Sequence, residues 1–411
     1  MYYRLQDCCK LVSGARRGAI YNLQSGKVLS INQGALQLLL ACQQGPLEDV
    51  VDINSPEDKL FVDFLQRLTE LGLGSLYLQK PASSPAEEAE EAPPKLDFLW
   101  LELTSGCNNR CLHCYATSGP CADCDAVPHE RWLSLIAEAR AAGAGAIQLI
   151  GGEPLLYPRW RELVDKARAE GFEFIEIFSN ATLITDDDIE FFKQRGVNIA
   201  TTIYAACPEI HDRVTLHPGS FAKTMAAVDK ILAAKIPLRI ASIVMKANET
   251  EAQNIMDLCG KLGVDVTPPD VVRPTGRGDD KELLPTAYQK PPIGPPFYTD
   301  PFTFQKAHSC HSCLVGKIAV TAGGDVIPCI FARSMVCGNI LTAPLSDILN
   351  GQLLQQCWHT TKDQVDKCKD CEYRYACADC RPLAQGTDSA KRWLACSADC
   401  PYNPHTGKWE E

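Results

Sequence analysis

The chain has 411 residues with a formal net charge of −11, and hydrophobic residues make up 45% of it. At about 100–200 residues per domain, this length predicts roughly two to four domains, and the composition suffices for a globular core. The acidic balance argues against a nucleic acid or an anionic membrane surface as a partner. No run approaches the ~18 apolar residues of a membrane-spanning helix.

Cysteine is the unusual residue of this sequence. The chain contains 21 cysteines, most of them in a few tight clusters. The first residues contain no apolar core of signal-peptide length, so we expect a cytoplasmic protein. In a reducing compartment, clustered thiols are typical of metal sites rather than of disulfides.

Residues 1–80 are expected to form an independent unit. Three short strands are predicted over 2–12, 19–23 and 27–31, with a hairpin turn at 24–26. Apolar residues at helical spacing predict helices over 33–41 and 57–71, and a strand over 75–78 closes the unit. The next stretch, 81–96, is rich in Pro, Ala, Ser and Glu and predicts a flexible acidic linker. An exposed helix over its glutamates is the alternative.

From residue 97 to residue 284, short apolar runs alternate with helical stretches. Runs such as FLWLEL and AIQLI are typical of buried parallel strands, and about six strand–helix units predict an α/β fold with a partial (β/α)6 TIM-like barrel. Residues 285–309 are rich in Pro and Gly and predict a bridging loop. Residues 310–411 are dense in cysteine, so metal sites rather than a core are expected to hold them together.

Three thiols follow the first long strand at a spacing of C-x3-C-x2-C, in Cys107, Cys111 and Cys114. Three thiolates can bind three irons of a four-iron cluster and leave the fourth iron open. A structural zinc site needs four ligands, and the only nearby candidate, His113, lies between two of the cysteines. The second strand ends in Gly151-Gly152-Glu153-Pro154, which by itself predicts only a tight turn.

These two motifs together resemble the radical S-adenosylmethionine (SAM) family, and the aromatic Tyr115 beside the last cysteine fits as well. The resemblance implies an oxidoreductase-type enzyme whose open iron binds SAM. Reduction of the cluster then yields a 5′-deoxyadenosyl radical that abstracts a hydrogen atom from the substrate. It also implies that residues 151–154 contact the amino group of SAM, while the protein positions the reactants and excludes water.

The same resemblance suggests further SAM contacts. Ser179 and Asn180 end the third strand, where ligand groups collect in parallel β/α folds. Arg213 is a candidate partner for the SAM carboxylate, with a surface ion pair as the alternative. The family often carries an aspartate near Tyr204, but two alanines follow it here. No catalytic residue is assigned.

The C-terminal cysteines resemble the SPASM extension, which binds auxiliary iron–sulfur clusters. One of its elements is Gly324-x4-Cys329. The resemblance implies a first cluster on Cys310, Cys313, Cys329 and Cys380. It implies a second cluster on Cys368, Cys371, Cys377 and Cys396. The spacing before Cys380 is two residues instead of the family's three, and a zinc ribbon on Cys368, Cys371, Cys377 and Cys380 is the alternative.

Five other cysteines stay open. Cys400 competes with Cys396 and Cys337 with Cys310, whereas Cys357, Cys121 and Cys124 have no assigned role.

Residues 1–80 resemble the PqqD-like peptide-recognition element, a small winged helix-turn-helix, through YNLQSGKVLSIN and LTELGLGSL. Such elements take the leader of a precursor peptide as an added strand beside a helix. DNA binding is the alternative, but the basic residues here do not line a recognition helix.

The three resemblances together imply a radical SAM/SPASM maturase of a ribosomally synthesised precursor peptide, whose leader binds residues 1–80. We expect a thioether cross-link of the sactipeptide or ranthipeptide type. Carbon–carbon cross-linking, epimerisation and a non-peptide cofactor precursor are the alternatives within enzymes, and an electron-transfer scaffold is the alternative outside them. Flavodoxin or ferredoxin is the expected reducing partner, with no nucleic acid and no membrane.

Overall fold

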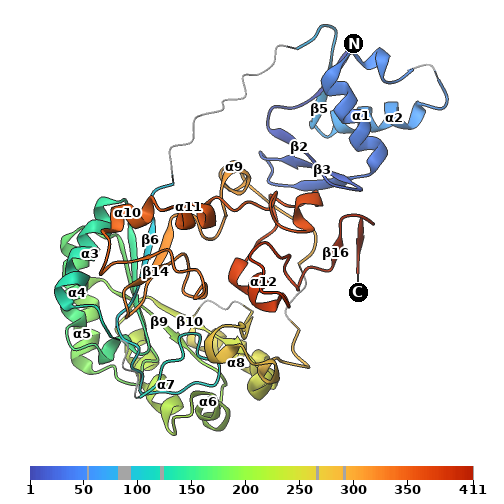
Figure 1. Cartoon of the computed structure of the whole chain (residues 1–411). Coiled ribbons are helices and arrows are strands. Elements are labelled where there is room, and N and C mark those ends of the chain that lie inside the picture. The colour runs from blue at the N-terminus through green and yellow to red at the C-terminus, as the bar shows by residue number, and fades with distance from the viewer. Residues whose placement is uncertain (53–54, 82–93, 121–124, 265–267, 290–292, 411) are drawn as a thin grey trace.

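The structure is a computed structural model that describes residues 1–410 except 53–54, 82–93, 121–124, 265–267 and 290–292. Figure 1 shows a small N-terminal domain beside a larger body, which consists of a sheet with outer helices and an irregular C-terminal region. The C-terminal region lies between the sheet and the N-terminal domain (Figure 1). The predicted linker falls almost entirely outside the described residues.

Two small sheets and two main helices build the N-terminal domain. Strands β2 (Cys9–Ser13), β3 (Gly18–Asn22) and β4 (Val28–Ile31) form an antiparallel sheet, and β1 (Tyr2–Leu5) pairs with β5 (Gly74–Tyr77). Helix α1 (Gln33–Gln44) begins at Asn32, whose side chain accepts a hydrogen bond from the Ala35 amide. Helix α2 (Lys59–Glu70) packs Leu65 and Leu68 into a core that contains Leu36 and Leu39.

The single strand predicted over residues 2–12 is wrong in one respect. The chain turns after Leu5, where the Cys9 amide donates to the Gln6 carbonyl at 2.8 Å. The first half then pairs with β5 and the second half with β3, so one predicted strand belongs to two sheets. The two predicted helices and the closing strand are confirmed within a few residues.

Five parallel strands form the centre of the larger body. They are β6 (Phe98–Glu102), β7 (Ala146–Ile150), β8 (Phe174–Phe178), β9 (Asn198–Thr202) and β10 (Leu238–Ala241). Their outer face is covered by α3 (His129–Ala141), α4 (Trp160–Ala169), α5 (Asp186–Arg195) and α7 (Ser220–Ala233) (Figure 1). Both faces of these strands are buried, which is why they are continuous apolar runs in the sequence.

The last of the five apolar runs of the predicted core leaves the sheet part-way along. The apolar run 238–244 divides into β10 and the short β11 (Ile243–Val244), which pairs in parallel with β12 (Asp270–Val271) in a separate sheet. Helix α6 (Pro208–Thr215) follows β9, and α8 (Ala252–Leu262) lies between β11 and β12. The contiguous parallel sheet of the predicted core therefore has five strands rather than six.

The C-terminal region completes the sheet at its other edge. Strand β13 (Lys317–Val320) pairs in parallel with β6, and β14 (Asp325–Ile327) and β15 (Gly338–Asn339) continue it antiparallel. Helices α10 (Leu345–Leu349) and α11 (Gln352–Trp358) add Leu354 and Trp358 to the main hydrophobic core. The expectation that this region lacks a core is therefore wrong for residues 314–358, because they share the core of the sheet.

The predicted bridging loop contains a helix, α9 (Pro301–Ser309). Its cap is Asp300, whose carboxylate accepts a hydrogen bond from the Thr303 amide at 2.9 Å, and Pro301 fits the first helical turn. Just before it, the chain pairs with the N-terminal sheet, where the Thr299 amide donates to the Gly26 carbonyl at 2.8 Å. The remaining elements are α12 (Arg381–Thr387), β16 (Tyr402–Asn403) and β17 (Lys408–Trp409).

None of the helices in the described ranges is both long enough and apolar enough to cross a bilayer.

Candidate active site and iron–sulfur sites

The loop after β6 carries Cys107, Cys111 and Cys114, and hydrogen bonds with two distant segments hold it. The Arg110 and Leu112 amides each donate a 3.0 Å hydrogen bond to a carbonyl near the end of α6. Arg277, from the segment after β12, donates to the Cys111 carbonyl at 2.9 Å and to the Ser118 carbonyl at 2.8 Å. The three thiols are thus fixed before any ligand binds.

Burial disfavours the ionised, thiolate form of Cys107 and Cys111. It raises the pKa of Cys107 and of Cys111 to about 12, and for Cys111 the neighbouring thiols Cys114 and Cys107 add to this effect. A bound cation would offset the cost of ionising them, so the donor set fits a metal cluster. No trio of His, Cys, Asp or Glu side chains in the described parts of the chain converges closely enough for one metal ion. A cubane cluster places each thiolate on a different iron and therefore suits a wider spacing.

His113 does not join the thiols as a ligand. Its ring packs edge-on against Tyr204 with centroids 5.0 Å apart. Burial lowers the pKa of His113 to about 4. The contact with Tyr204 supports the loop, and no group of three metal-binding side chains in the described residues includes His113, which disfavours the zinc alternative.

The segment after β7 clamps onto the cysteine loop. The Gly152 amide donates to the Thr104 carbonyl at 2.7 Å and the Glu153 amide to the Gly106 carbonyl at 2.8 Å. A Cβ on Gly152 would lie 2.0 Å from the Gly106 oxygen, so only glycine allows this approach. Pro154 then begins a short 3-10 turn that the Glu153 side chain caps.

Glu153 is fully buried and ties two strand ends together. Its carboxylate accepts hydrogen bonds from Ser179 Oγ at 2.8 Å, from the Asn180 amide at 2.8 Å and from the Leu155 amide at 3.1 Å. Burial raises the pKa of Glu153 to about 7 against these donors. The structure therefore brings together three of the predicted SAM-site residues, and it directs the carboxylate to protein donors.

Asn180 connects this clamp to the cysteine loop. Its side-chain amide donates to Asn108 Oδ1 at 2.8 Å and approaches Cys107 Sγ at 3.9 Å. The carboxyl ends of β6, β7 and β8 thus meet at the thiols, which is the end where parallel β/α folds bind ligands.

Arg213 and Tyr115 lie farther from the clamp. Arg213 is exposed in the last turn of α6 and has no ion-pair partner within the described ranges, so its contact with SAM stays a prediction. Tyr115 is half-buried, and its ring packs against Phe331 with centroids 5.2 Å apart.

An ion pair that sequence reasoning missed joins the sheet to the C-terminal region. Arg333 donates to the Glu102 carboxylate at 2.6 Å, and its guanidinium lies 6.0 Å from the Tyr115 ring. Burial raises the pKa of Glu102, and the Arg333 charge opposes that rise. The signal was present, because Glu102 is a charged residue inside the apolar run FLWLEL.

The first C-terminal thiol set contains Cys313, Cys329 and Cys380. Burial raises the pKa of Cys329 to about 12, and the charges of Cys313 and Cys380 contribute. Arg273 donates to Cys380 Sγ at 2.9 Å. Cys310 is buried in the main hydrophobic core at the end of α9, so its role as fourth ligand stays a prediction.

The second set gathers five thiols rather than four. Cys368 Sγ lies 3.8 Å from Cys396 Sγ. A hydrogen bond from Cys396 lowers the pKa of Cys400 to about 6, so Cys400 belongs to the same set. Burial raises the pKa of Cys371 to about 12, and the charges of Cys368 and Cys377 add to it. The competition between Cys396 and Cys400 therefore remains.

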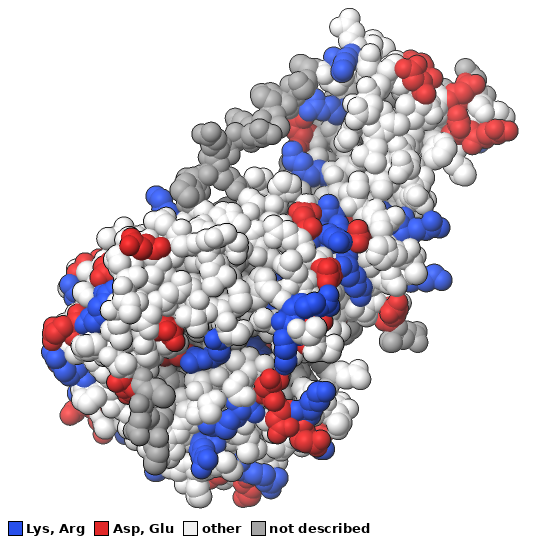
Figure 2. All heavy atoms as spheres, viewed as in Figure 1, with Lys and Arg blue, Asp and Glu red and all other residues white. Residues whose placement is uncertain are grey.

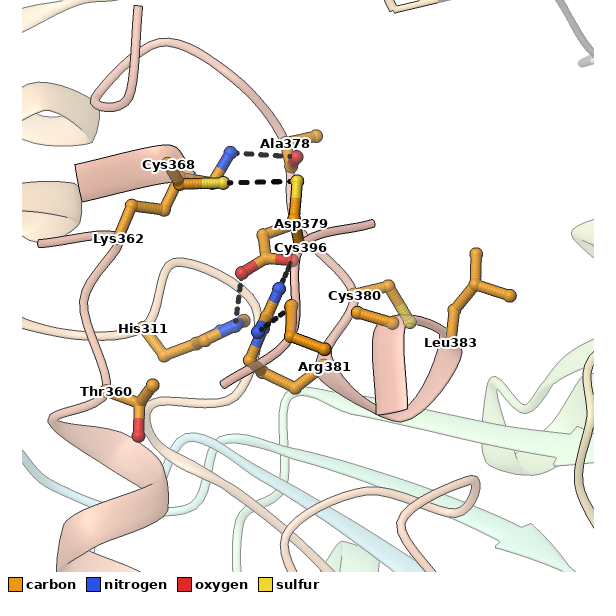
Figure 3. Close-up of polar contacts among 12 residues, drawn as sticks. His311, Thr360, Lys362, Cys368, Ala378, Asp379, Cys380, Arg381, Leu383 and Cys396 are labelled. Carbon is orange, nitrogen blue, oxygen red and sulfur yellow. Dashed lines mark hydrogen bonds and ion pairs between the residues drawn. The ribbon is translucent and has the colours of Figure 1, made fainter. Parts of the chain in front are cut away.

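Figure 3 shows Cys380 directed away from Cys368 and Cys396. This separation disfavours the zinc-ribbon alternative, which needs Cys380 beside Cys368. Cys337 hydrogen-bonds with Cys357, outside both sets. Cys121 and Cys124 lie outside the described residues.

Comparisons with known proteins agree with this division. Residues 101–259 match the profile of the radical SAM superfamily, and residues 304–372 match that of the SPASM iron–sulfur cluster-binding domain. The N-terminal domain lies outside both matches.

Two curated relatives that match most of this chain differ in kind. The AdoMet-dependent heme synthase of Methanosarcina barkeri is 27% identical over 347 residues, which cover 76% of this chain and 97% of that protein. The subtilosin biosynthesis protein AlbA of Bacillus subtilis is 24% identical over 366 residues, which cover 84% of this chain and 80% of AlbA.

Among solved structures, Streptococcus suis SuiB bound to the precursor peptide SuiA shares the fold with a TM-score of 0.61 at 13% identity. This likeness covers 97% of this chain and 99% of SuiB.

Proposed function

Because the chain carries a radical SAM domain and a SPASM domain, we propose that it modifies a ribosomally synthesised precursor peptide. It is an enzyme, and its cofactors are a [4Fe-4S] cluster, SAM and auxiliary iron–sulfur clusters. Together the cluster and SAM supply a radical that removes a hydrogen atom from the substrate.

The chain's own residues divide this work. Cys107, Cys111 and Cys114 hold the SAM-binding cluster, and the glycines of 151–154 let that segment approach the cysteine loop. Glu153 aligns the ends of β7 and β8, where Ser179 and Asn180 contribute polar groups to the SAM site. Arg213 is the proposed partner of the SAM carboxylate.

The observation that carries the peptide proposal is a groove in the N-terminal domain. A cavity of about 590 Å³ lies between the start of α1 and α2, and Thr406 of the C-terminal tail closes one side. Helix α2 contributes Leu60 and Phe61, and Arg16 and Arg17 line it as well. Leu60 is 80% exposed and Phe61 beside it is 36% exposed, so two neighbouring apolar side chains of the groove face solvent.

The side chains that line this groove fit an extended peptide. Apolar side chains can seat against α2, and the two guanidiniums complement a peptide carboxylate. The edge of β4 is only partly available, because the Val28 amide already donates to the Phe297 carbonyl at 3.3 Å. The peptide is therefore expected in the groove beside α2 rather than along the whole strand.

The groove does not resemble a nucleic-acid site. Figure 2 shows Lys and Arg interspersed with Asp and Glu on the face that it draws, without a continuous basic stripe. Phosphate backbones need such a stripe.

Relatives support the peptide class and keep one alternative open. SkfB of Bacillus subtilis is named a sporulation killing factor maturation protein, and it is 28% identical over 164 residues, which cover 40% of this chain and 39% of SkfB. The likeness to peptide-bound SuiB spans 97% of this chain, whereas the heme synthase match spans 76%. A non-peptide cofactor precursor such as a tetrapyrrole is the second candidate.

Within the peptide class we propose a thioether between a cysteine sulfur and a carbon, with a carbon–carbon link or epimerisation as alternatives. The leader occupies the N-terminal groove, and flavodoxin or ferredoxin supplies electrons. Residues 1–80 act as a PqqD-like recognition element in this proposal.

Mass spectrometry of anaerobic reactions tests the proposal. The reconstituted protein receives SAM, dithionite and either candidate precursor peptides or a tetrapyrrole precursor. Loss of two hydrogen atoms from a peptide, with the cysteine blocked to alkylation, identifies the thioether. Deuterium uptake from D2O without another mass change identifies epimerisation, and a modified tetrapyrrole with unchanged peptides refutes the peptide proposal.

Two cysteine variants separate the cluster roles. Cys111→Ala is expected to abolish formation of 5′-deoxyadenosine, because two thiolates cannot hold the cluster. Cys371→Ala is expected to retain some SAM cleavage and to lose the modified product. Unchanged product formation in Cys371→Ala contradicts the auxiliary-cluster assignment.

A further inference from the structure

A buried lysine lies against the second C-terminal thiol set. Lys362 follows α11 and is only 8% exposed. Its Nζ donates to the Cys377 carbonyl at 2.7 Å and to the Ala378 carbonyl at 3.1 Å. Figure 3 shows this amine in the view beside the sulfurs of Cys368 and Cys396, which lie 3.8 Å apart.

The lysine is held in its charged form. Its Nζ donates to two carbonyl oxygens at 2.7 and 3.1 Å, and a lysine side chain is ordinarily protonated at neutral pH. Because only 8% of Lys362 is exposed, water and salt screen its field on the thiol set less than they screen a surface charge.

Nearby charges do not cancel this one. Asp379 pairs with Arg381 at 2.6 Å and faces His311 Nε2 at 3.5 Å, so its negative charge is already compensated. Arg381 is fully buried and also donates to the Ala395 carbonyl at 2.8 Å. Lys367 adds a second cation, whose Nζ donates to the Cys400 carbonyl at 3.0 Å.

We propose that Lys362 is a fixed positive charge that raises the reduction potential of the auxiliary cluster held by the second thiol set. One-electron reduction by dithionite adds one negative charge to that cluster and breaks no bond. The ammonium attracts the more negative reduced cluster more strongly than the oxidised one, and it therefore stabilises the reduced state. This inference rests on the auxiliary cluster and is independent of which substrate the enzyme modifies.

The chain offers a matched control. Lys369 is next to Cys368 in the sequence but is exposed, so solvent and salt screen its charge. Lys362→Met and Lys369→Met remove the same charge from a buried and an exposed position.

A redox titration of the reconstituted full chain, followed by electron paramagnetic resonance, tests the proposal. At a fixed potential, Lys362→Met is expected to lower the ratio of reduced to oxidised auxiliary cluster about tenfold, which for one electron is about 59 mV. Lys369→Met is expected to leave the ratio unchanged. An unchanged ratio in Lys362→Met, with iron content equal to that of the parent protein, overturns the proposal.

Two more variants separate charge from packing. Lys362→Arg keeps the charge and is expected to keep the parent ratio, and a shift as large as that of Lys362→Met refutes a role for charge. If Lys362→Met loses iron, Lys362→Gln is titrated in its place. Iron loss from both neutral variants but not from Lys362→Arg supports the need for the charge, and iron loss from all three overturns the proposal in favour of packing.

Discussion

The contact between the N-terminal domain and the second thiol set centres on Glu372, which follows Cys371. Its side chain is fully buried, and Oε1 accepts from Tyr402 at 2.6 Å and from Ser30 at 3.3 Å. Arg17 lies 3.8 Å from the same oxygen, with 36% of its side chain exposed. Ser30 and Arg17 belong to the N-terminal domain. We therefore expect Glu372→Ala to loosen the attachment of the N-terminal domain to the C-terminal region.

The cost follows from these geometries. The short bond from Tyr402 to a carboxylate is worth about 1.5–3 kcal/mol, and the long bond from Ser30 adds about 0.5 kcal/mol. The half-exposed Arg17 contributes less than about 1 kcal/mol after solvent screening. Only the Ser30 and Arg17 contacts reach the N-terminal domain, so we expect Glu372→Ala to weaken its attachment by about 1 kcal/mol, whereas Glu372→Gln keeps an acceptor oxygen and loses less.

Hydrogen exchange measures this opening directly. The Ala15 amide donates across the interface to the Asp370 carbonyl at 2.7 Å, so it exchanges when the two regions separate. A loss of about 1 kcal/mol corresponds to roughly fivefold faster exchange. Iron content is measured alongside, since Glu372 neighbours Cys371.

Unchanged exchange at Ala15 in Glu372→Ala would refute this reasoning. The apolar contacts of Tyr21 with Phe304 and Tyr375 would then hold the domain on their own.

Three further predictions concern the other sites. Gly152→Ala is expected to lower the iron content of the SAM-binding site, because its Cβ would meet the Gly106 oxygen at 2.0 Å. Gly145→Ala, whose Cβ would meet nothing within 4 Å, is expected to leave the iron content unchanged. Equal iron content in both variants contradicts the clamp. Leu60→Asp is expected to weaken binding of a fluorescent leader peptide about tenfold by anisotropy, and Leu78→Asp, 88% exposed and outside the groove, serves as the control. The Glu153 carboxyl has a pKa raised from 4.5 to about 7, so its folded form binds a proton more tightly than its unfolded form. The stability of the cluster-free chain relative to Glu153→Gln is therefore expected to fall as pH rises from about 4.5 to about 7, and a rise in urea midpoint over that window would show the opposite sign.

Local sequence patterns predicted the elements whose signal is local. The five apolar runs became β6–β10 because strands buried on both faces need no polar alternation. The three thiols Cys107, Cys111 and Cys114 were also predictable, because residues so close together in the sequence lie on one loop.

Pairings between distant segments were beyond such patterns. Nothing in the run 317–320 indicates that it lies beside β6, and helix α9 was missed because Pro301 reads as a breaker outside the context of the Asp300 cap. The contacts of Arg273 with Cys380 and of Arg333 with Glu102 join residues that only the folded chain brings together. A buried charge in an apolar strand was the one sequence signal for them.

The position of β13 beside β6 also affects how this protein folds during its synthesis. On the ribosome, β6 emerges with its partner β7 soon after it, but its other partner is translated only near the end of the chain. Until then one edge of the nascent sheet carries unpaired amides and carbonyls, which can pair with other chains. Removal of the C-terminal region consequently does not detach a module but reopens the sheet at its first strand.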